Sequence, residues 1–255
     1  MADVYALEIS LTHEGGHQHI YPVLIKDDQD TVLVDCGYPH FIIQLQEAAE
    51  RYGCKLDAVN KMIVTHHDID HMGCLAAFKR AYPHIEIIAH ELEIPYISGL
   101  KKSLRLEQAE STLSQMPDEA KAHAEQFIAM LRSIEPAAVD KAVTHAERLP
   151  WCGGIEIIHT PGHMPGHISL YLSSSKTLIA GDVVVIEDGR LEIANPQYTL
   201  DMEEAVRSVR LLLEYDIDRL ICYHGGLFEG NIREALGELI VRYASQKSII
   251  EKELH

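Results

Sequence analysis

Basic side chains are scarce in this sequence of 255 residues, which has 22 lysines and arginines against 39 aspartates and glutamates, for a formal charge of −17. Because so acidic a surface repels a phosphate backbone, we expect no nucleic-acid partner. No run of 18 apolar residues occurs, and the first ten residues lack the basic segment of a secretory signal. We therefore predict a cytoplasmic protein with no membrane partner, acting on a small molecule.

Paired cysteines are also missing. The five cysteines, at positions 36, 54, 74, 152 and 222, include no Cys-x-x-Cys motif, which is typical of reduced thiols rather than of a disulfide framework. No internal repeat, low-complexity tract or linker is visible, and 47% apolar residues are enough to form a substantial core. We predict a single domain over residues 1–255. The sequence leaves the oligomeric state open, and a homodimer is one possibility.

Strand and helix patterns alternate along most of the chain. Short segments rich in β-branched residues predict strands at 4–12, 19–26, 31–35, 61–65, 85–89, 155–160, 168–173, 177–180 and 219–223. Apolar residues at helical spacing predict helices at 41–52 and 71–82, and capping boxes predict two more that begin at Asp201 and Asn231. Active-site residues in such folds collect where strands end.

Residues 92–148 differ from the rest, because they are charged, helical in pattern and free of strand signals. Pro117, followed by two acidic residues, predicts the start of a helix whose apolar stripe includes Phe127 and Leu131. The segment is predicted to be a helical insertion. Its stripe either packs on the core or forms a lid over a substrate pocket.

Histidine is abundant, with 16 residues, and several lie at predicted strand ends beside aspartates. The stretch THHDIDHMG, residues 65–73, holds five such side chains, and TPGH at 160–163, AGD at 180–182 and YHGG at 223–226 supply others. Imidazoles and carboxylates concentrated in loops with glycines are how proteins surround metal ions. The sequence therefore predicts a metal site at the strand ends.

Taken in order, THHDIDHMG, TPGHMPGH, LIAGD and YHGG resemble the motifs of the metallo-β-lactamase-fold hydrolases, and the resemblance runs from Val4 to the last helix. It implies an αββα sandwich of the α/β (α+β) class, here with a helical insertion at about 92–148. It also implies two divalent metal ions. Their implied ligands are His66, Asp68 and His163 for the first ion and Asp70, His71 and His224 for the second, with Asp182 bridging the two.

The resemblance further implies hydrolysis of a small ester, lactone or thioester by a metal-bridging hydroxide, formed because two ions lower the pKa of a shared water to about 7. Asp70 would assist the leaving group. Tyr198 lies in NPQYTLD, where related lactonases present a tyrosine to the substrate carbonyl, and is the candidate oxyanion donor. The alternative is that Tyr198 is a packed aromatic with its hydroxyl in water.

Asp68 departs from the family pattern His-x-His-x-Asp-His, in which this position is a histidine. With two dications, three aspartates and a hydroxide, the centre would be formally neutral, whereas a neutral imidazole would leave it at plus one. We hypothesise less electrophilic metals than usual. Zinc is the first expectation, with iron or manganese as alternatives, because these harder ions would compete better at such a site.

The substrate class and the activity itself leave alternatives. The helical insertion favours the lactonase branch over the glyoxalase II-like branch, whose members carry a C-terminal helical domain. A β-lactamase or another amide hydrolase is one alternative, and a non-catalytic, metal-containing binding or regulatory protein is another.

Two neighbours of the ligands have supporting roles in this interpretation. His67 is predicted to lie outside the ligand set, behind the ligands or exposed, and Asp35 to order the loop beneath them.

Overall fold

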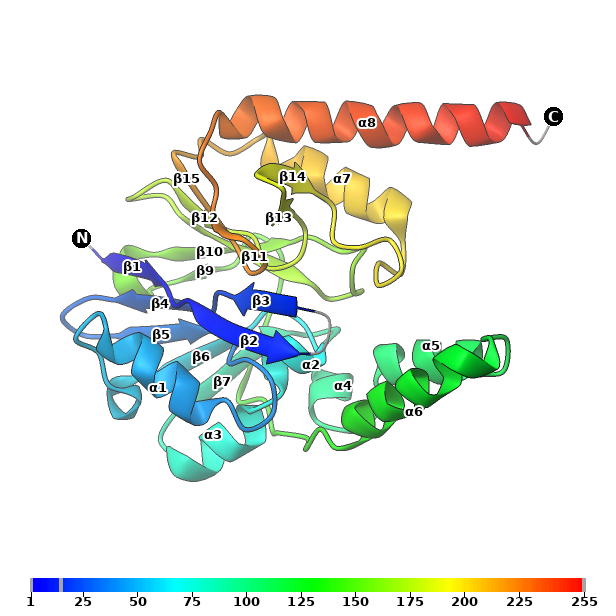
Figure 1. Cartoon of the computed structure of the whole chain (residues 1–255). Helices are drawn as coiled ribbons and strands as arrows, with labels where there is room; N and C mark the ends of the chain where they lie inside the picture. Colours follow the sequence, from blue (N-terminus) through cyan, green and yellow to red (C-terminus); the bar gives the residue numbers. More distant parts are fainter. Residues whose placement is uncertain (1, 14–15, 254–255) are drawn as a thin grey trace.

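Two six-stranded β-sheets lie face to face at the centre of the molecule, in a computed structural model that describes residues 2–13 and 16–253 (Figure 1). The first sheet has the order β1 (Asp3–Ala6), β4 (Val23–Lys26), β5 (Thr31–Val34), β6 (Lys61–Val64), β7 (Glu86–His90) and β8 (Lys141–Val143). The second has the order β16 (Gly226–Leu227), β15 (Arg219–Cys222), β12 (Thr177–Ile179), β11 (Ile168–Leu172), β10 (Ile155–His159) and β9 (Arg148–Leu149). Strands β5 to β8 run parallel, as do β12 and β15.

Helices cover the outer face of each sheet. Helices α1 (Ile42–Glu50) and α3 (Leu75–Ala81) pack against the first sheet, and α7 (Met202–Leu212) and α8 (Ile232–Glu253) lie over the second (Figure 1). The central core lies between the sheets, where side chains such as Ile63 and Leu170 are fully buried. The predicted αββα sandwich is confirmed. Because the central strands are buried on both faces, they appear in the sequence as continuous apolar runs.

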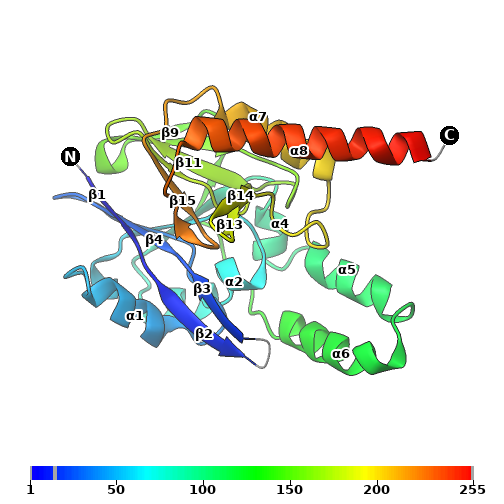
Figure 2. The same ribbon diagram turned by 45° about the horizontal axis from the view of Figure 1, so that its top comes forward.

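The two N-terminal segments predicted as single strands are each divided in the structure. Residues 4–12 form β1 and the start of β2 (Ile9–His13), and residues 19–26 form the end of β3 (Gly16–Ile20) and then β4. The division falls at Leu7 and Pro22, where the Leu7 N–H donates to the Pro22 carbonyl. Strands β2 and β3 form a separate two-stranded ribbon that leaves the first sheet (Figure 2). The division lets the ribbon reach the strand ends where the motifs lie.

The segment 92–148 is helical only in part. It contains α4 (Ile94–Ile97), α5 (Leu104–Leu113) and α6 (Asp118–Arg132), but also β8, so the prediction that it lacks strands is wrong. β8 is an edge strand in which only Val143 is buried, so three residues carry too little apolar pattern to reveal it. Helices α5 and α6 pack together and project beside the strand ends (Figures 1 and 2). In α6 only Ile128 and Leu131 are buried.

Two further elements complete the surroundings of the strand ends. The hairpin of β13 (Val185–Glu187) and β14 (Arg190–Glu192) follows β12, and α7 begins at the predicted N-cap, where Asp201 accepts from the Glu204 N–H at 2.9 Å. Gly162 has φ of +130°, and a Cβ there would lie 2.3 Å from the Ala205 nitrogen. Glycine therefore lets the TPGH loop approach the first turn of α7. Within the described residues, no helix has the length and apolar character to cross a membrane.

Candidate metal centre

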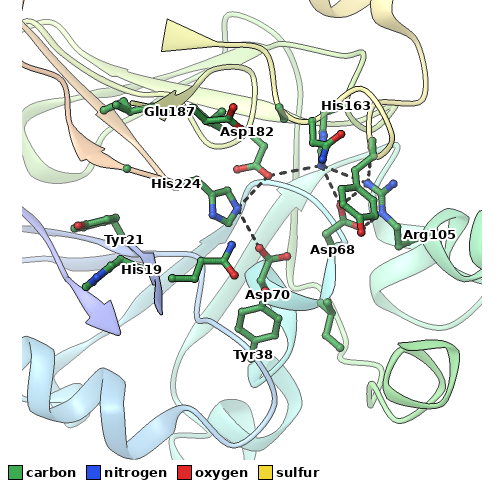
Figure 3. Close-up of a pocket in the computed structure, with 18 of the residues that line it drawn as sticks. His19, Tyr21, Tyr38, Asp68, Asp70, Arg105, His163, Asp182, Glu187 and His224 are labelled. Atoms are coloured by element: carbon green, nitrogen blue, oxygen red, sulfur yellow. Dashed lines mark hydrogen bonds and ion pairs between the residues drawn. The ribbon is translucent and has the colours of Figure 1, made fainter. Parts of the chain in front are cut away.

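Four loops at the same edge of the sandwich bring the predicted ligands together (Figure 3). The first loop follows β6 and leads into α2 (Ile69–Met72). The others follow β10, β12 and β15 and carry His163, Asp182 and His224. All seven residues named from the sequence lie in this cluster: His66, Asp68, Asp70, His71, His163, Asp182 and His224.

The seven side chains form two groups with Asp182 between them. In the first group, ligand atoms of His66, Asp68 and His163 all lie within 4.8 Å of one another, and the second group of Asp70, His71 and His224 meets the same limit. The Asp182 Oδ2 atom lies 3.4 Å from His71 Nε2, 3.5 Å from His224 Nε2 and 3.7 Å from His163 Nε2. Asp182 is thus placed to serve both groups.

The hydrogen bonds of two histidines aim their free nitrogens into the cluster. His66 Nδ1 lies 3.1 Å from the Thr65 hydroxyl, and His71 Nδ1 lies 2.8 Å from Asp35 Oδ2. The Nε2 atoms of both rings, and Asp182 Oδ1, are buried without a hydrogen-bond partner in the described part of the chain. Buried polar atoms are otherwise almost always paired, and ligating histidines are oriented through their other nitrogen. The donor set therefore fits divalent metal ions.

The acidic groups of the cluster favour positive charge. Burial opposes protonation of His224, but Asp182 and Asp70 outweigh it and raise the pKa of this imidazole to about 10. Burial likewise opposes the charged form of His71, whose pKa is nevertheless raised well above the usual value by Asp182, Asp35 and Asp70. Burial lowers the pKa of His66, helped by the neighbouring His71. The carboxylates that raise the pKa values of His71 and His224 would also attract divalent metal ions.

A model of the metallo-β-lactamase superfamily matches residues 15–224. The chain belongs to the metallo-β-lactamase superfamily. Two Bacillus subtilis proteins described as probable metallo-hydrolases are similar to it along most of their length. YflN is 28% identical over 87% of this chain and 86% of its own, and YybB is 24% identical over 88% of each chain.

Solved structures agree with this membership at the level of the fold. A metallo-β-lactamase family protein from Thermus thermophilus superimposes with a TM-score of 0.73 at 20% identity, over 95% of this chain and 79% of that one. A metallo-β-lactamase from Cronobacter sakazakii gives a TM-score of 0.66 at 20% identity, over 99% and 96% of the two chains. The fold that the motifs implied is therefore the observed one.

Asp68, the departure from the superfamily motif, is held by an arginine that the sequence did not reveal. Arg105 of α5 donates from Nη2 to Asp68 Oδ2 at 2.7 Å and from Nε to Oδ1 at 3.1 Å. Asp68 Oδ2 also lies 3.0 Å from His163 Nε2. Although burial opposes ionisation, Arg105 and His163 hold the pKa of Asp68 well below its usual range. In the sequence, only the carboxylate of Asp68 pointed to such a partner, because a buried anion requires a cation beside it.

His67 is buried rather than exposed, and it points away from the ligands toward a second residue that the sequence did not single out. Its backbone N–H donates to Glu93 Oε2 at 2.9 Å, and its Nδ1 contacts the same oxygen. Glu93 Oε1 accepts from the Gly166 N–H at 2.8 Å. The buried Glu93 therefore connects the loop after β6 with the loop that carries His163. Of the two predicted positions for His67, behind the ligands or exposed, only the first holds.

A cavity of about 590 Å³ opens over the cluster. Its walls include Phe127 and Met130 of α6, so part of the apolar stripe of the insertion faces the cavity. Tyr38 lies beneath Asp70 (Figure 3), and burial, followed by the charge of Asp70, raises the pKa of its hydroxyl far above the usual value. Tyr198 also lines the cavity, with its ring 5.0 Å from the Arg105 guanidinium.

Proposed function

We propose that this protein is a metal-dependent hydrolase that cleaves a small ester, lactone or thioester. The observation that carries the proposal is the seven-residue cluster at the floor of a cavity, in which the Nε2 atoms of His66 and His71 have no hydrogen-bond partner among the described residues. His66, Asp68 and His163 would hold one ion and Asp70, His71 and His224 the other, with Asp182 shared. Two such ions, zinc first and iron or manganese as alternatives, would supply an activated water and polarise the scissile carbonyl.

The side chains around the cluster support specific roles. Asp70 Oδ2 lies 3.1 Å from His224 Nε2, and the Asp70 carboxylate is partly exposed to the cavity, where it can pass a proton to a leaving group. Tyr198 is 39% exposed, and its backbone carbonyl accepts from Arg105 at 2.7 Å. Its place at the wall supports the role of hydrogen-bond donor to the substrate oxygen.

Apart from the proposed metal ions, the lining offers little positive charge to an anionic substrate. Four carboxylates line it, those of Asp68, Asp70, Asp182 and Glu187. Among the lining residues that the structure describes, Arg105 is the only lysine or arginine, and its nitrogens already donate to Asp68, to Gln108 and to the Tyr198 carbonyl. No free lysine or arginine of the described lining is thus available for the carboxylate of a β-lactam. Phe127 and Met130 suit the apolar part of an ester or lactone.

A substrate panel tests the proposal. It contains neutral aryl esters, lactones, an acyl thioester and a β-lactam, each assayed with and without a chelator. We expect turnover of an ester, lactone or thioester that the chelator abolishes and added zinc restores. Turnover of the β-lactam alone would favour the amide hydrolase, and no turnover by protein that retains bound metal would favour a non-catalytic binding protein. The lactonase branch is the first candidate, because the helical insertion lines the cavity.

Replacing Tyr198 by phenylalanine is expected to lower kcat by about tenfold or more, because it removes one hydrogen bond to the developing oxyanion. Metal content, measured by elemental analysis, should not change. Tyr82→Phe is the matched control, since Tyr82 is partly buried and outside the residues that line the cavity. A Tyr198→Phe enzyme with unchanged kcat would remove this hydroxyl from the reaction.

We also propose that the chain functions as one domain in the cytoplasm with a small-molecule substrate and no nucleic-acid or membrane partner. The acidic balance of 39 carboxylates against 22 basic side chains supports the absence of a nucleic-acid partner. The oligomeric state is left open between a monomer and a homodimer, and sedimentation of the purified protein would distinguish the two.

A further inference from the structure

Arg105 is a buried cation placed against the metal cluster by the helical insertion. Only 3% of its surface is exposed, and it engages both carboxylate oxygens of Asp68. A bidentate guanidinium–carboxylate pair of this kind is the strongest common form of ion pair. Its Nη2 also lies 3.5 Å from His163 Nε2. Arg105 therefore lies immediately behind the first group of predicted ligands.

The fold holds the guanidinium in place from several sides. Gln108 Oε1 accepts from Arg105 Nη1 at 2.6 Å, and the Tyr198 carbonyl accepts from Nη2. One residue before Arg105, the Leu104 N–H donates to His67 Nε2 at 3.3 Å, which attaches the start of α5 to the loop that carries Asp68. Arg105 is therefore a fixed part of the site and cannot leave Asp68 without breaking these contacts.

The charge of Arg105 offsets that of Asp68. Two dications, three aspartates and one hydroxide would sum to zero formal charge, and the guanidinium would bring the total to plus one. A centre with a neutral histidine at position 68 has the same total. With Arg105 included, the formal charge gives no reason to expect less electrophilic metals, which Asp68 alone suggested. Asp68 and Arg105 together thus carry no net charge, as a neutral histidine ligand would.

We propose that Asp68 and Arg105 act as one electroneutral unit in place of a histidine ligand, so that metal binding by the first group requires the two residues to be matched. The proposal rests on the proposed metal occupancy. The superfamily motif has a histidine at position 68, but the proposal predicts that restoring this histidine weakens metal binding here. Asp68→His would leave the Arg105 cation buried beside two metal ions with no anion to offset it.

A double-mutant cycle tests this coupling through metal affinity. Wild type, Asp68→His, Arg105→Gln and the double variant are stripped of metal and titrated with zinc against a chromophoric chelator. We expect the weaker of the two zinc affinities to fall about 10- to 100-fold in Asp68→His. Adding Arg105→Gln should recover at least tenfold of that loss. The matched control adds Arg132→Gln, an exposed arginine of the same insertion, and should recover nothing.

Two results would overturn the proposal: an Asp68→His protein that binds both zinc ions as tightly as wild type, or a double variant as weak as the single one. A wild-type protein that binds no second zinc ion contradicts instead the dinuclear centre of the proposed function. Should Asp68→His fail to fold, by circular dichroism, Asp68→Asn replaces it, since asparagine keeps the shape of aspartate. Adding Arg105→Gln to Asp68→Asn should then recover zinc affinity in the same way, and a double variant without this recovery would contradict the coupling of Asp68 and Arg105.

Discussion

Asp182→Asn is expected to reduce turnover of the ester, lactone or thioester substrate by about a hundredfold or more, the largest effect we predict on activity. Asp182 Oδ2 lies within 3.7 Å of the Nε2 atoms of His71, His163 and His224, so it serves both groups of ligands. Asparagine keeps the shape but removes the negative charge that a pair of dications would share. Steady-state kinetics and metal analysis of the purified variant measure the effect.

The control for this variant is Asp118→Asn, in which an aspartate with 94% of its side chain exposed loses the same charge at the start of α6. Its turnover and metal content should match those of wild type. If Asp182→Asn kept wild-type turnover and two bound metals, the bridging role of Asp182 would be wrong, and the centre would have to be assigned to the remaining six residues.

Glu93→Ala is expected to lower the free energy of unfolding by about 3–5 kcal/mol, the largest effect we predict on stability. Three donors would lose their acceptor: the His67 and Gly166 backbone N–H groups and the His67 ring. Each buried donor left unpaired costs about 1–3 kcal/mol, and the deleted side chain leaves a cavity as well. Urea denaturation of metal-free wild type and variant, compared at equal m-values, gives the difference.

Glu91→Ala supplies the comparison, because Glu91 is exposed two residues earlier in the same loop and should change stability by less than about 0.5 kcal/mol. A Glu93→Ala protein as stable as Glu91→Ala would show that the buried carboxylate is dispensable. The metal affinity of Glu93→Ala is also informative, since Glu93 connects the loop of His66 with the loop of His163. A loss of affinity would show that this connection positions the ligands.

The insertion has a larger part in the site than its sequence indicated. Its pattern left open whether the stripe of α6 packs on the core or covers a pocket, and the structure places part of the stripe in the wall of the cavity and packs α6 against α5. Ile128 and Leu131 are buried, while Phe127 and Met130 line the cavity. Periodicity identifies an apolar face but not its partner, because core and pocket walls use the same side chains.

Local signals were reliable where a few neighbouring residues determine the outcome. The capping box at Asp201 correctly marked the start of α7, and the strand before His66 ends where the pattern changes. Long N-terminal strands and the short edge strand β8 were less well predicted. Their limits depend on which neighbour each strand pairs with, and a pairing partner distant in sequence leaves no mark in the segment itself.

The sequence by itself determined the αββα fold and the identity of the seven clustered residues through the resemblance of its four ordered motifs to the superfamily. The motifs are short, and each follows a strand whose carboxyl end reaches the same edge. Only the tertiary structure placed Arg105 on Asp68 and Glu93 on His67. These partners lie 37 and 26 residues apart in sequence. Buried charges must be paired, but which distant residue supplies the opposite charge is decided by the packing of the helical insertion against the loop after β6.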